Sequence, residues 1–358
     1  MNIKTDGIVH HPLGGASYMF EKEIIPYLLK QLTKDHIKIS VGAQVNSSPH
    51  FGTLITIALS YELALQLEKK SNKKASILYE IIETAPGEES TINGLKYQKN
   101  LEASGEINKY LDEYIEILNH YSKITGIEYE IRYQSEFNNS KEIYPIIKNI
   151  LNHREFISSR LDPKYNNLRV RSSCPKCGLT DKHSVKNEYI GDYIYFMCPV
   201  HGKYRVNFIT ETHKLEYNSP LRNLIRGIFY STVNNSDDYD YQILRVTGSD
   251  YAGFYQEEMR YKLASHLGYD VSKMSFIFYA PLIMDWSGAK MSKSLYVKKG
   301  AYNDIPQEFI NYHLLKNIRG IESLNTILKI VETWFENPYM LFRNYTIYYF
   351  IKEFQKYE

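Results

Sequence analysis

Apolar residues recur with two different periods along the first third of the chain. Stretches 37–42, 74–79 and 127–132 alternate between apolar and polar residues, which predicts three short strands. Between them, residues 51–69 and 106–125 place their apolar side chains at helical spacing and predict two helices. An order of strand, helix, strand, helix, strand is typical of a parallel sheet covered by helices. We therefore predict an α/β fold with a doubly wound, Rossmann-like parallel sheet.

This pattern is interrupted in the middle of the chain and then resumes. Residues 165–215 carry aromatic and polar residues without a clear period, which indicates an insertion. After about residue 222, segments 244–247 and 275–279 are apolar and predict two more strands. Helical spacing predicts four further helices, over residues 19–34, 305–317, 323–336 and 338–357.

Composition and charge narrow the class of protein only slightly. The 358 residues suffice for two or three packed units, and 43% hydrophobic with 23% charged residues is ordinary for a globular protein. The formal net charge of +2 gives no strong basic field, so charge neither indicates nor excludes nucleic-acid binding. The N-terminus lacks an apolar core of signal-peptide length, and no stretch reaches the roughly 18 apolar residues of a membrane span. We therefore expect a cytoplasmic protein with no membrane partner.

Three cysteines and a histidine have the spacing of a metal site. Cys174 and Cys177 form a Cys-x-x-Cys-Gly motif, and Cys198 and His201 form a Cys-x-x-His-Gly motif further along the chain. The glycine after the second ligand of each pair permits the tight turn of a zinc knuckle. Three thiolates and one imidazole make a closed tetrahedral set, which is typical of structural zinc.

The sequence leaves other assignments of this metal site open. His183 and His213 are alternative fourth ligands, although their spacing fits a knuckle less well. A catalytic zinc needs an open coordination position, whereas four protein ligands leave none. We predict a structural Zn²⁺ that holds the insertion together, because the insertion has few apolar residues of its own.

The turn between the first predicted strand and the long helix carries a histidine and a glycine. The sequence Pro49-His50-Phe51-Gly52-Thr53 opens this helix. Free N–H groups and the positive end of the helix dipole attract phosphates at such a position. Glycine lets a ligand approach the backbone closely, and histidine can donate to a phosphate oxygen as charge develops. The alternative is a histidine near a helix start that binds no ligand.

A second motif places two lysines on either side of a hydroxyl group. The string Lys290-Met291-Ser292-Lys293-Ser294 follows an apolar strand and a glycine-containing turn. Such a loop can close over a triphosphate and neutralise the departing pyrophosphate. A solvated, lysine-rich loop is the alternative.

Together, these two motifs resemble the HIGH and KMSKS signatures of the class I aminoacyl-tRNA synthetases in letters, order and wide separation. The resemblance implies an ATP site between them, with His50, Lys290 and Lys293 as catalytic residues and the two lysines on the β and γ phosphates. Thr53 departs from the pattern, because the superfamily commonly has a second histidine at this position.

A Gly248-Ser249-Asp250 turn after a predicted strand resembles a further element of this superfamily. There the aspartate accepts hydrogen bonds from the ribose hydroxyls, and a helix-capping aspartate is the alternative. The ATP site that the resemblance implies comprises Gly42, His50, Gly52, Thr53, Gly248, Asp250, Lys290, Ser292 and Lys293.

Within the superfamily, the chain resembles the class I lysyl-tRNA synthetases. The resemblance rests on the cysteine knuckle between the two half-sheets and on the following helix with Arg222 and Arg226. It implies lysine as the candidate amino acid. Segment 304–358 is too short for the helical anticodon-binding domain of those enzymes, which is a departure. Candidate residues for the amino-acid pocket are Glu80, Glu83, Tyr251, Gln256 and Glu257.

The predicted organisation has four parts. Residues 1–160 contain an N-terminal arm and the first half of the Rossmann-like domain, and residues 161–221 form the zinc-knuckle insertion. Residues 222–303 form the second half with the KMSKS-like loop, and residues 304–358 form a short helical region. The N-terminal arm carries a His10-His11 pair, for which a lid, a substrate contact and a polar surface arm are all compatible with the sequence.

The implied reaction is ATP-dependent activation of an amino acid as an aminoacyl-adenylate. A carboxylate is already ionised at neutral pH, so no protein nucleophile is needed, and Mg²⁺ accompanies ATP mainly on its phosphates. The acyl acceptor is either the acceptor stem of a tRNA or, in a stand-alone ligase, a small amine or thiol. A non-catalytic paralogue that binds nucleotide or tRNA is a third reading. The sequence does not indicate an oligomeric state.

Overall fold

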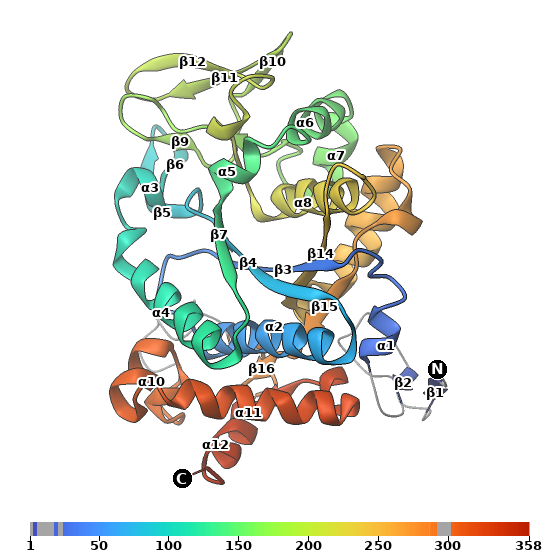
Figure 1. Cartoon of the computed structure of the whole chain (residues 1–358). Helices are drawn as coiled ribbons and strands as arrows, with labels where there is room; N and C mark the ends of the chain where they lie inside the picture. The colour runs from blue at the N-terminus through green and yellow to red at the C-terminus, as the bar shows by residue number, and fades with distance from the viewer. Residues whose placement is uncertain (1–2, 6–17, 21–23, 286, 292–301, 358) are drawn as a thin grey trace.

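A parallel five-stranded sheet lies at the centre of the computed structural model (Figure 1). The structure describes residues 3–5, 18–20, 24–285, 287–291 and 302–357. The strand order is β15-β14-β3-β4-β7, and every pairing is parallel. The chain builds β3, β4 and β7 toward one edge and then returns to add β14 and β15 on the other side of β3. The predicted mixed α/β fold with a parallel sheet is therefore confirmed. The bounds are β3 (His36–Ala43), β4 (Lys74–Ile81), β7 (Tyr129–Tyr133), β14 (Tyr241–Gly248) and β15 (Ile277–Ala280).

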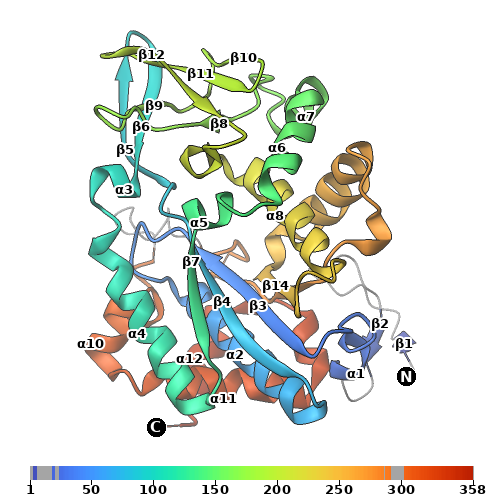
Figure 2. The same ribbon diagram turned by 45° about the horizontal axis from the view of Figure 1, so that its top comes forward.

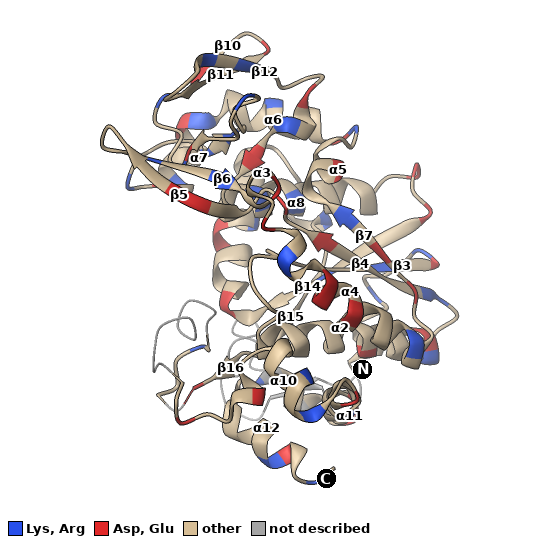
Figure 3. Cartoon of the chain, turned by 90° about the vertical axis from the view of Figure 1, so that its left-hand side faces the viewer, with Lys and Arg blue, Asp and Glu red and all other residues tan. Residues whose placement is uncertain are grey.

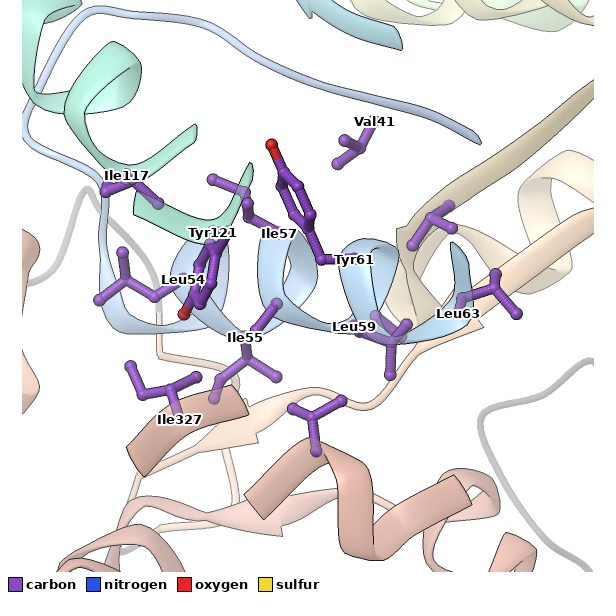
Figure 4. Packing of buried hydrophobic residues seen from close by; sticks show 14 of the residues in the cluster. Val41, Leu54, Ile55, Ile57, Leu59, Tyr61, Leu63, Ile117, Tyr121 and Ile327 are labelled. Atoms are coloured by element: carbon purple, nitrogen blue, oxygen red, sulfur yellow. The ribbon is translucent and has the colours of Figure 1, made fainter. Parts of the chain in front are cut away.

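Helix α2 (Phe51–Lys70) is buried on nearly all of its sides. Its sequence is apolar around the whole circumference, as expected of a helix that lies between two layers. One side packs under the sheet and the other packs on α11 (Ser323–Glu336), while α4 (Asn108–Thr125) covers its start. Figure 4 shows this packing, with Tyr121 of α4 and Ile327 of α11 approaching α2 from different sides. None of the helices in the described part of the chain is long and apolar enough to cross a lipid bilayer.

The opposite face of the sheet is covered by α8 (Ser219–Asn234) and by the π-helical segment η3 (Phe254–Ala264). These elements share a second apolar core with α6 (Ile143–Asn152) and α7 (Arg154–Leu161). The sheet thus separates two cores, and the covering of both faces by helices is what a parallel sheet requires.

A hairpin from an earlier part of the chain pairs with the predicted insertion 161–221. A hairpin of β5 (Pro86–Ile92) and β6 (Leu95–Asn100) pairs with β9 (Thr180–Asp181). Figures 1 and 2 place this hairpin beside the β10-β11-β12 sheet, on the far side of the molecule from α10–α12. The hairpin was not predicted, although its turn residues Asn93 and Gly94 have φ values of 49° and 77°. An Asn-Gly pair between alternating residues is a strong hairpin signal.

Three predicted helices differ in the structure. The predicted helix 305–317 is α-helical only from Tyr312 onward, within Tyr312–Arg319, and a 3₁₀ turn at Gln307–Phe309 precedes it. Only Ile25–Leu28 of the predicted helix 19–34 is α-helical within the described residues, because residues 18–20 form a strand and Thr33 N–H donates to Gln242 Oε1 at 2.7 Å. The predicted helix 338–357 is interrupted at Tyr345, whose N–H donates to the Leu282 carbonyl oxygen at 2.9 Å. This contact leads into the parallel pairing of β16 with β17, a separate two-stranded sheet that joins the C-terminal region to the segment just after β15.

The remaining elements are shorter or lie outside the central sheet. The strands are β1 (Ile3–Thr5), β2 (Tyr18–Phe20), β8 (Val170–Arg171), β10 (Glu188–Ile190), β11 (Tyr193–Cys198), β12 (Gly202–Asn207), β13 (Glu216–Tyr217), β16 (Ile283–Met284) and β17 (Tyr345–Thr346). The α-helices are α1 (Ile25–Leu28), α3 (Leu101–Ser104), α5 (Gln134–Asn138), α10 (Tyr312–Arg319) and α12 (Ile347–Phe354). The 3₁₀ segments are η1 (Thr212–Lys214), η2 (Ser249–Tyr251), η4 (Val271–Lys273), η5 (Gln307–Phe309) and η6 (Pro338–Phe342).

A buried ionic cluster joins the sheet to α8. The Glu80 carboxylate on β4 accepts hydrogen bonds from Arg132 on β7, from Tyr230 on α8 and from Ser40 on β3. Arg226 Nη1 of α8 lies 3.4 Å from the same carboxylate. Because Glu80 is only 2% exposed, its charge depends on these partners rather than on water.

We predict that replacing Glu80 by Gln destabilises the protein by about 3–5 kcal/mol at neutral pH, because two buried guanidiniums lose their carboxylate. Burial alone would raise the pKa of Glu80, but the charges of Arg226 and Arg132 and the Tyr230 hydroxyl lower this pKa to about 2. A carboxyl group with a lowered pKa stabilises the fold above its unfolded pKa of 4.5, and this contribution is lost as pH falls toward about 2.

The difference in unfolding free energy between wild type and Glu80→Gln should therefore shrink on acidification, and urea titrations at several pH values measure it. Glu130→Gln is the matched control, since the Glu130 side chain is 49% exposed and pairs with Lys38 at 2.7 Å. Its cost should stay below about 1 kcal/mol. Equal costs for the two variants, or a Glu80 effect that does not change with pH, would contradict the prediction.

Candidate functional site

A cavity of about 630 Å³ lies at the carboxyl ends of β3, β4 and β14. In doubly wound sheets ligands bind at this edge, where the strand order reverses between two neighbouring strands. Here the reversal falls between β3 and β14. Most of the predicted site residues line this cavity, namely Gly42, His50, Gly52, Thr53, Glu80, Gly248, Asp250, Tyr251 and Lys290. The predicted Ser292 and Lys293, and the His10-His11 pair, lie outside the described residues.

His50 is the N-cap of α2. Its backbone is extended, with φ −73° and ψ 161°, and its Nδ1 accepts a hydrogen bond of 3.3 Å from Thr53 N–H. A neutral imidazole whose Nδ1 accepts carries its proton on Nε2, so Nε2 is the donor atom of this ring. The ring lies over Gly52, where a Cβ atom would meet His50 Nδ1 at 3.2 Å. Gly52 therefore makes room for the histidine as well as for a ligand.

The C-terminal region holds the His50 turn from outside the sheet. Phe51 N–H donates to the Ile310 carbonyl oxygen at 3.1 Å, and Tyr312 N–H donates to the Pro49 carbonyl oxygen at 2.8 Å. These bonds satisfy one of the exposed donors at the start of α2. Within the described part of the chain, the Gly52 N–H has no acceptor. It is the helix-terminal donor that an anion in the cavity can use.

Lys290 and Asp250 meet at one end of the cavity. The Lys290 ammonium forms an ion pair with the Asp250 carboxylate, and the two side chains are 38% and 28% exposed. The Lys290 Nζ also lies 5.8 Å from the ring centroid of Tyr251. The predicted HIGH-like turn, the Gly-Ser-Asp turn and the first lysine of the KMSKS-like loop are thus brought to one cavity from segments far apart in the sequence.

Two stacked tyrosines also line the cavity. Tyr251 and Tyr255 stack with ring centroids 5.1 Å apart, and the Arg245 guanidinium lies 5.1 Å from the Tyr255 ring. Lys290 thus lies beside one ring of the pair and Arg245 beside the other. We call the part of the cavity at Lys290 and Asp250 the lysine end, and the part at Arg222, Arg226 and Arg245 the arginine end.

The arginine end concentrates positive charge. Arg222, Arg226 and Arg245 all line the cavity, and Glu80 is the carboxylate there. The exterior differs, since basic and acidic residues are interspersed over the face shown in Figure 3. Sequence reasoning missed Arg245, although an arginine within the apolar stretch 243–246 is a signal, because charged residues are rarely placed in a buried strand without a partner or a ligand.

Three predicted pocket residues do not line the cavity. The Glu83 carboxylate accepts two hydrogen bonds of 2.7 Å from the Gln134 and Ser135 N–H groups at the start of α5, so it caps a helix. Glu257 has a 72% exposed side chain, which pairs with Lys262 at 2.8 Å. Gln256, on the π-helical segment η3, is not among the residues that line the cavity. The structure thus places Glu83, Gln256 and Glu257 away from the site in which they were predicted.

The cysteine and histidine side chains of the insertion converge on one point. The ligand atoms of Cys174, Cys177, Cys198 and His201 all lie within 4.8 Å of one another, so this cluster can hold a metal ion. His183 and His213 do not belong to it. The Cys177–Cys198 sulfur distance is 3.5 Å, and His201 Nδ1 lies 3.6 and 3.7 Å from two sulfurs.

These distances fit a tetrahedral ion. Zn–S bonds near 2.3 Å and Zn–N bonds of about 2.0–2.1 Å separate tetrahedral ligand atoms by roughly 3.5–3.8 Å. The two glycines that follow the ligand pairs, Gly178 and Gly202, have φ values of 74° and 78°, as the predicted knuckle turns require. The residues present therefore fit a closed four-ligand metal site.

Comparisons with known proteins give similar solved structures at low sequence identity. No protein-family model matches the chain, and no curated protein matches it in sequence. Among solved structures, it is similar to an arginyl-tRNA synthetase from Campylobacter jejuni, with 12% identity and a TM-score of 0.35 over 85% of this chain and 66% of that chain. It is also similar to a glutamate-tRNA synthetase from Elizabethkingia anophelis, with 13% identity and a TM-score of 0.34 over 74% of this chain and 54% of that chain.

A glutamate tRNA ligase from Elizabethkingia meningosepticum, in complex with its amino acid, gives 14% identity and a TM-score of 0.32 over 74% of this chain and 53% of that chain. The chain thus spans between about half and two thirds of the length of these structures. All three neighbours are aminoacyl-tRNA synthetases. At these identities and TM-scores, they do not identify the substrate or the reaction of this chain.

Proposed function

We propose that the chain uses ATP to activate the carboxylate of an amino acid as an aminoacyl-adenylate, and that it transfers the acyl group to a tRNA. One observation carries this proposal. The His50 turn at the start of α2, the Gly248–Asp250 turn after β14 and Lys290 line the same cavity at the switch point of the sheet. This edge is where an α/β sheet binds a nucleotide.

Each group has a part in the proposed reaction. The Gly52 N–H and the Nε2 donor of His50 bind phosphate oxygens, and Asp250 accepts from the ribose hydroxyls. Lys290, with Lys293 of the same motif, neutralises the charge that develops on pyrophosphate as it leaves. Mg²⁺ binds mainly to the phosphates. The substrate carboxylate attacks the α-phosphorus directly, so catalysis is positioning and charge stabilisation.

The ion pair between Lys290 and Asp250 gives this site a simple order of events. In the protein without nucleotide, each charge is the partner of the other. ATP replaces the pair with two new ones, because the ribose occupies the aspartate and the phosphates occupy the lysine. Neither charge is left unpaired in either state, which keeps the cost of desolvation low.

The first test is amino-acid-dependent exchange between ATP and pyrophosphate, measured with each common amino acid, including the lysine that the resemblance suggests. We expect Lys290→Ala to lower kcat by about 100-fold or more while the KM for ATP changes much less, because the lysine acts on charge that develops in the transition state. Lys316→Ala is the matched control, since Lys316 is 43% exposed and pairs with Glu116 on α4. If none of the common amino acids supports exchange, the proposed activity is refuted.

The tRNA acceptor is supported by an aromatic and basic face on the insertion. Tyr193 and Tyr195 lie on β11 with ring centroids 6.4 Å apart. Arg205 and Lys203 of β12 lie 4.3 and 4.6 Å from these two rings, respectively. Neighbouring aromatic rings with cations beside them are the usual platform for unpaired nucleotides. A small amine or thiol acceptor would need no such face.

We predict that the double variant Tyr193→Ala with Tyr195→Ala lowers the transfer of the acyl group to tRNA by about tenfold or more, since each base stack contributes about 1–3 kcal/mol. Exchange between ATP and pyrophosphate should be unchanged. Tyr348→Ala, at an exposed tyrosine of α12, is the control. Release of AMP that a small amine or thiol stimulates, and that total tRNA does not, would instead favour the stand-alone ligase.

We further propose that the Cys₃His cluster binds a structural Zn²⁺. Its four protein ligands complete a tetrahedron, so the metal would connect the turn after β8 to the β11–β12 hairpin without taking part in the reaction.

Replacing Cys174 by Ser should remove about one equivalent of zinc and lower the melting temperature, because metal binding and folding are coupled in such a module. Metal analysis and thermal unfolding on the same preparation test this. His213→Gln, at the alternative ligand outside the cluster, should keep both the metal and the stability. A Cys174→Ser protein that lacks metal but melts like wild type would contradict the structural role.

A further inference from the structure

The arginine end of the cavity contains a buried cation that lacks a carboxylate partner. Arg222 is 4% exposed, and its hydrogen bonds go to neutral groups, the Tyr217 carbonyl oxygen at 3.4 Å and the Ser219 hydroxyl at 3.0 Å. Its Nε is buried without a hydrogen-bond partner. Among the described residues, Arg222 forms no ion pair.

The two neighbouring arginines bring no carboxylate that could serve as a counter-charge for Arg222. Arg226 pairs with Glu80, which also serves Arg132. Arg245 donates to the Asn223 side chain at 2.7 Å and to the Tyr255 hydroxyl at 3.3 Å, and within the described chain it also forms no ion pair. Four guanidiniums therefore share one carboxylate. The end of the cavity keeps an excess of positive charge that an unbound protein must tolerate.

The pKa of Arg222 reflects this surplus. Burial, together with the charges of Arg226, Arg171 and Arg245, lowers the pKa of Arg222 to about 9. Arg222 still carries its proton at neutral pH. A buried cation that is held in this way is destabilising until an anion joins it, which is a common property of binding sites.

Resting on the proposed function, we infer that Arg222 and Arg245 bind the side-chain carboxylate of the substrate, so that the activated amino acid is acidic, of the glutamate or aspartate class. The α-carboxylate has to reach the α-phosphorus at the lysine end. A second carboxylate on the same molecule then contacts Arg222 and Arg245 at the arginine end. A lysine ammonium would instead add positive charge there, since Glu80 is already taken by Arg132, Arg226 and Tyr230.

A phosphate of the nucleotide is the other anion that could meet these arginines. In the proposed site, the phosphates already meet Lys290 and the start of α2, which leaves Arg222 and Arg245 to the carboxylate. Separate measurements for amino acid and ATP distinguish the two sources.

The wild-type protein gives the first test. In the exchange assay, we expect kcat/KM to be about tenfold or more higher for the acidic amino acid than for its isosteric amide. The pairs to compare are L-glutamate with L-glutamine and L-aspartate with L-asparagine. The amide leaves the buried arginines without a counter-charge. L-lysine should be inactive. A preference for lysine or for a neutral amino acid would overturn the inference and leave the proposed activity intact.

The second test uses Arg222→Met. The two groups that accept from Arg222 in the wild type keep another donor in this variant. The Tyr217 carbonyl oxygen also accepts from Arg171 at 3.1 Å, and the Ser219 hydroxyl also accepts from Gln44 at 3.4 Å. The melting temperature without substrate should therefore equal or exceed that of wild type. The kcat/KM for the acidic amino acid should fall by about 10- to 100-fold, with little change in the KM for ATP.

Arg171→Met is the matched control. Arg171 is also 4% exposed, but it lies outside the cavity and 3.8 Å from the buried Glu216 carboxylate. Its loss should lower the melting temperature and leave the preference for acid over amide unchanged. A loss in ATP binding rather than amino-acid binding in Arg222→Met would overturn the inference.

If no amino acid supports exchange, the proposed activity fails and direct binding decides the inference. Isothermal titration with L-glutamate and L-aspartate should then show binding to wild type that is weakened at least about tenfold in Arg222→Met. Absence of binding to wild type would overturn the inference as well.

Discussion

The burial of Glu80 among arginines is the constraint on which the rest of the structure depends. A carboxylate near the carboxyl end of β4, beneath α8, would normally be excluded from a sheet face by the cost of desolvation. Arg132 from β7 and Arg226 from α8 make that burial possible, and together they connect three elements that are distant in the sequence. Because this face is polar at its carboxyl end, α8 cannot close against the strands there with apolar side chains. The cavity is the space that remains.

The two faces of the sheet therefore differ in the interactions that cover them. Beneath it, α2 packs with apolar side chains on all sides and holds the His50 turn in a fixed place at the edge of the sheet. The C-terminal region adds backbone hydrogen bonds to Pro49 and Phe51 from outside. Above the carboxyl end of the sheet, charge and hydrogen bonds join the strands to α8, while an apolar core that includes Ile243 and Ile277 packs against the same helix. A phosphate-binding helix terminus built on a rigid apolar layer and a cationic pocket built on a polar one meet at the same edge.

The parts of the fold that follow from local periodicity could be predicted from the sequence. The five central strands and α2, α4 and α11 were placed within a few residues, because their apolar patterns match the burial that the sheet imposes. The break in the predicted helix 338–357 could not be predicted, since Tyr345 contacts Leu282, which follows β15 and lies some sixty residues earlier in the sequence. The hairpin at residues 86–100 was available in the Asn93-Gly94 pair and was overlooked.

The site residues divide in the same way. Motif letters identified His50, Asp250 and Lys290, which the structure brings to one cavity. The sequence motifs could not show that Glu80 and Glu83, which lie on the same stretch of chain, have different roles. Glu83 meets the backbone N–H groups of Gln134 and Ser135, some fifty residues later, and such partners cannot be read from a strand alone.

Charge balance is the property that sequence motifs describe least well, and here it decides between substrates. The resemblance to lysyl-tRNA synthetases suggested that carboxylates after the second strand bind an ammonium group. In the structure, Glu83 caps a helix and Glu80 is already neutralised by two guanidiniums. The cations that remain, Arg222 and Arg245, lack counter-charges among the described residues. A pocket selects its ligand by what its own charges leave unpaired, because an unpaired buried charge costs more than a missing contact. The same letters on the same strands can thus serve an acidic substrate when the neighbouring helix contributes arginines that outnumber the carboxylates.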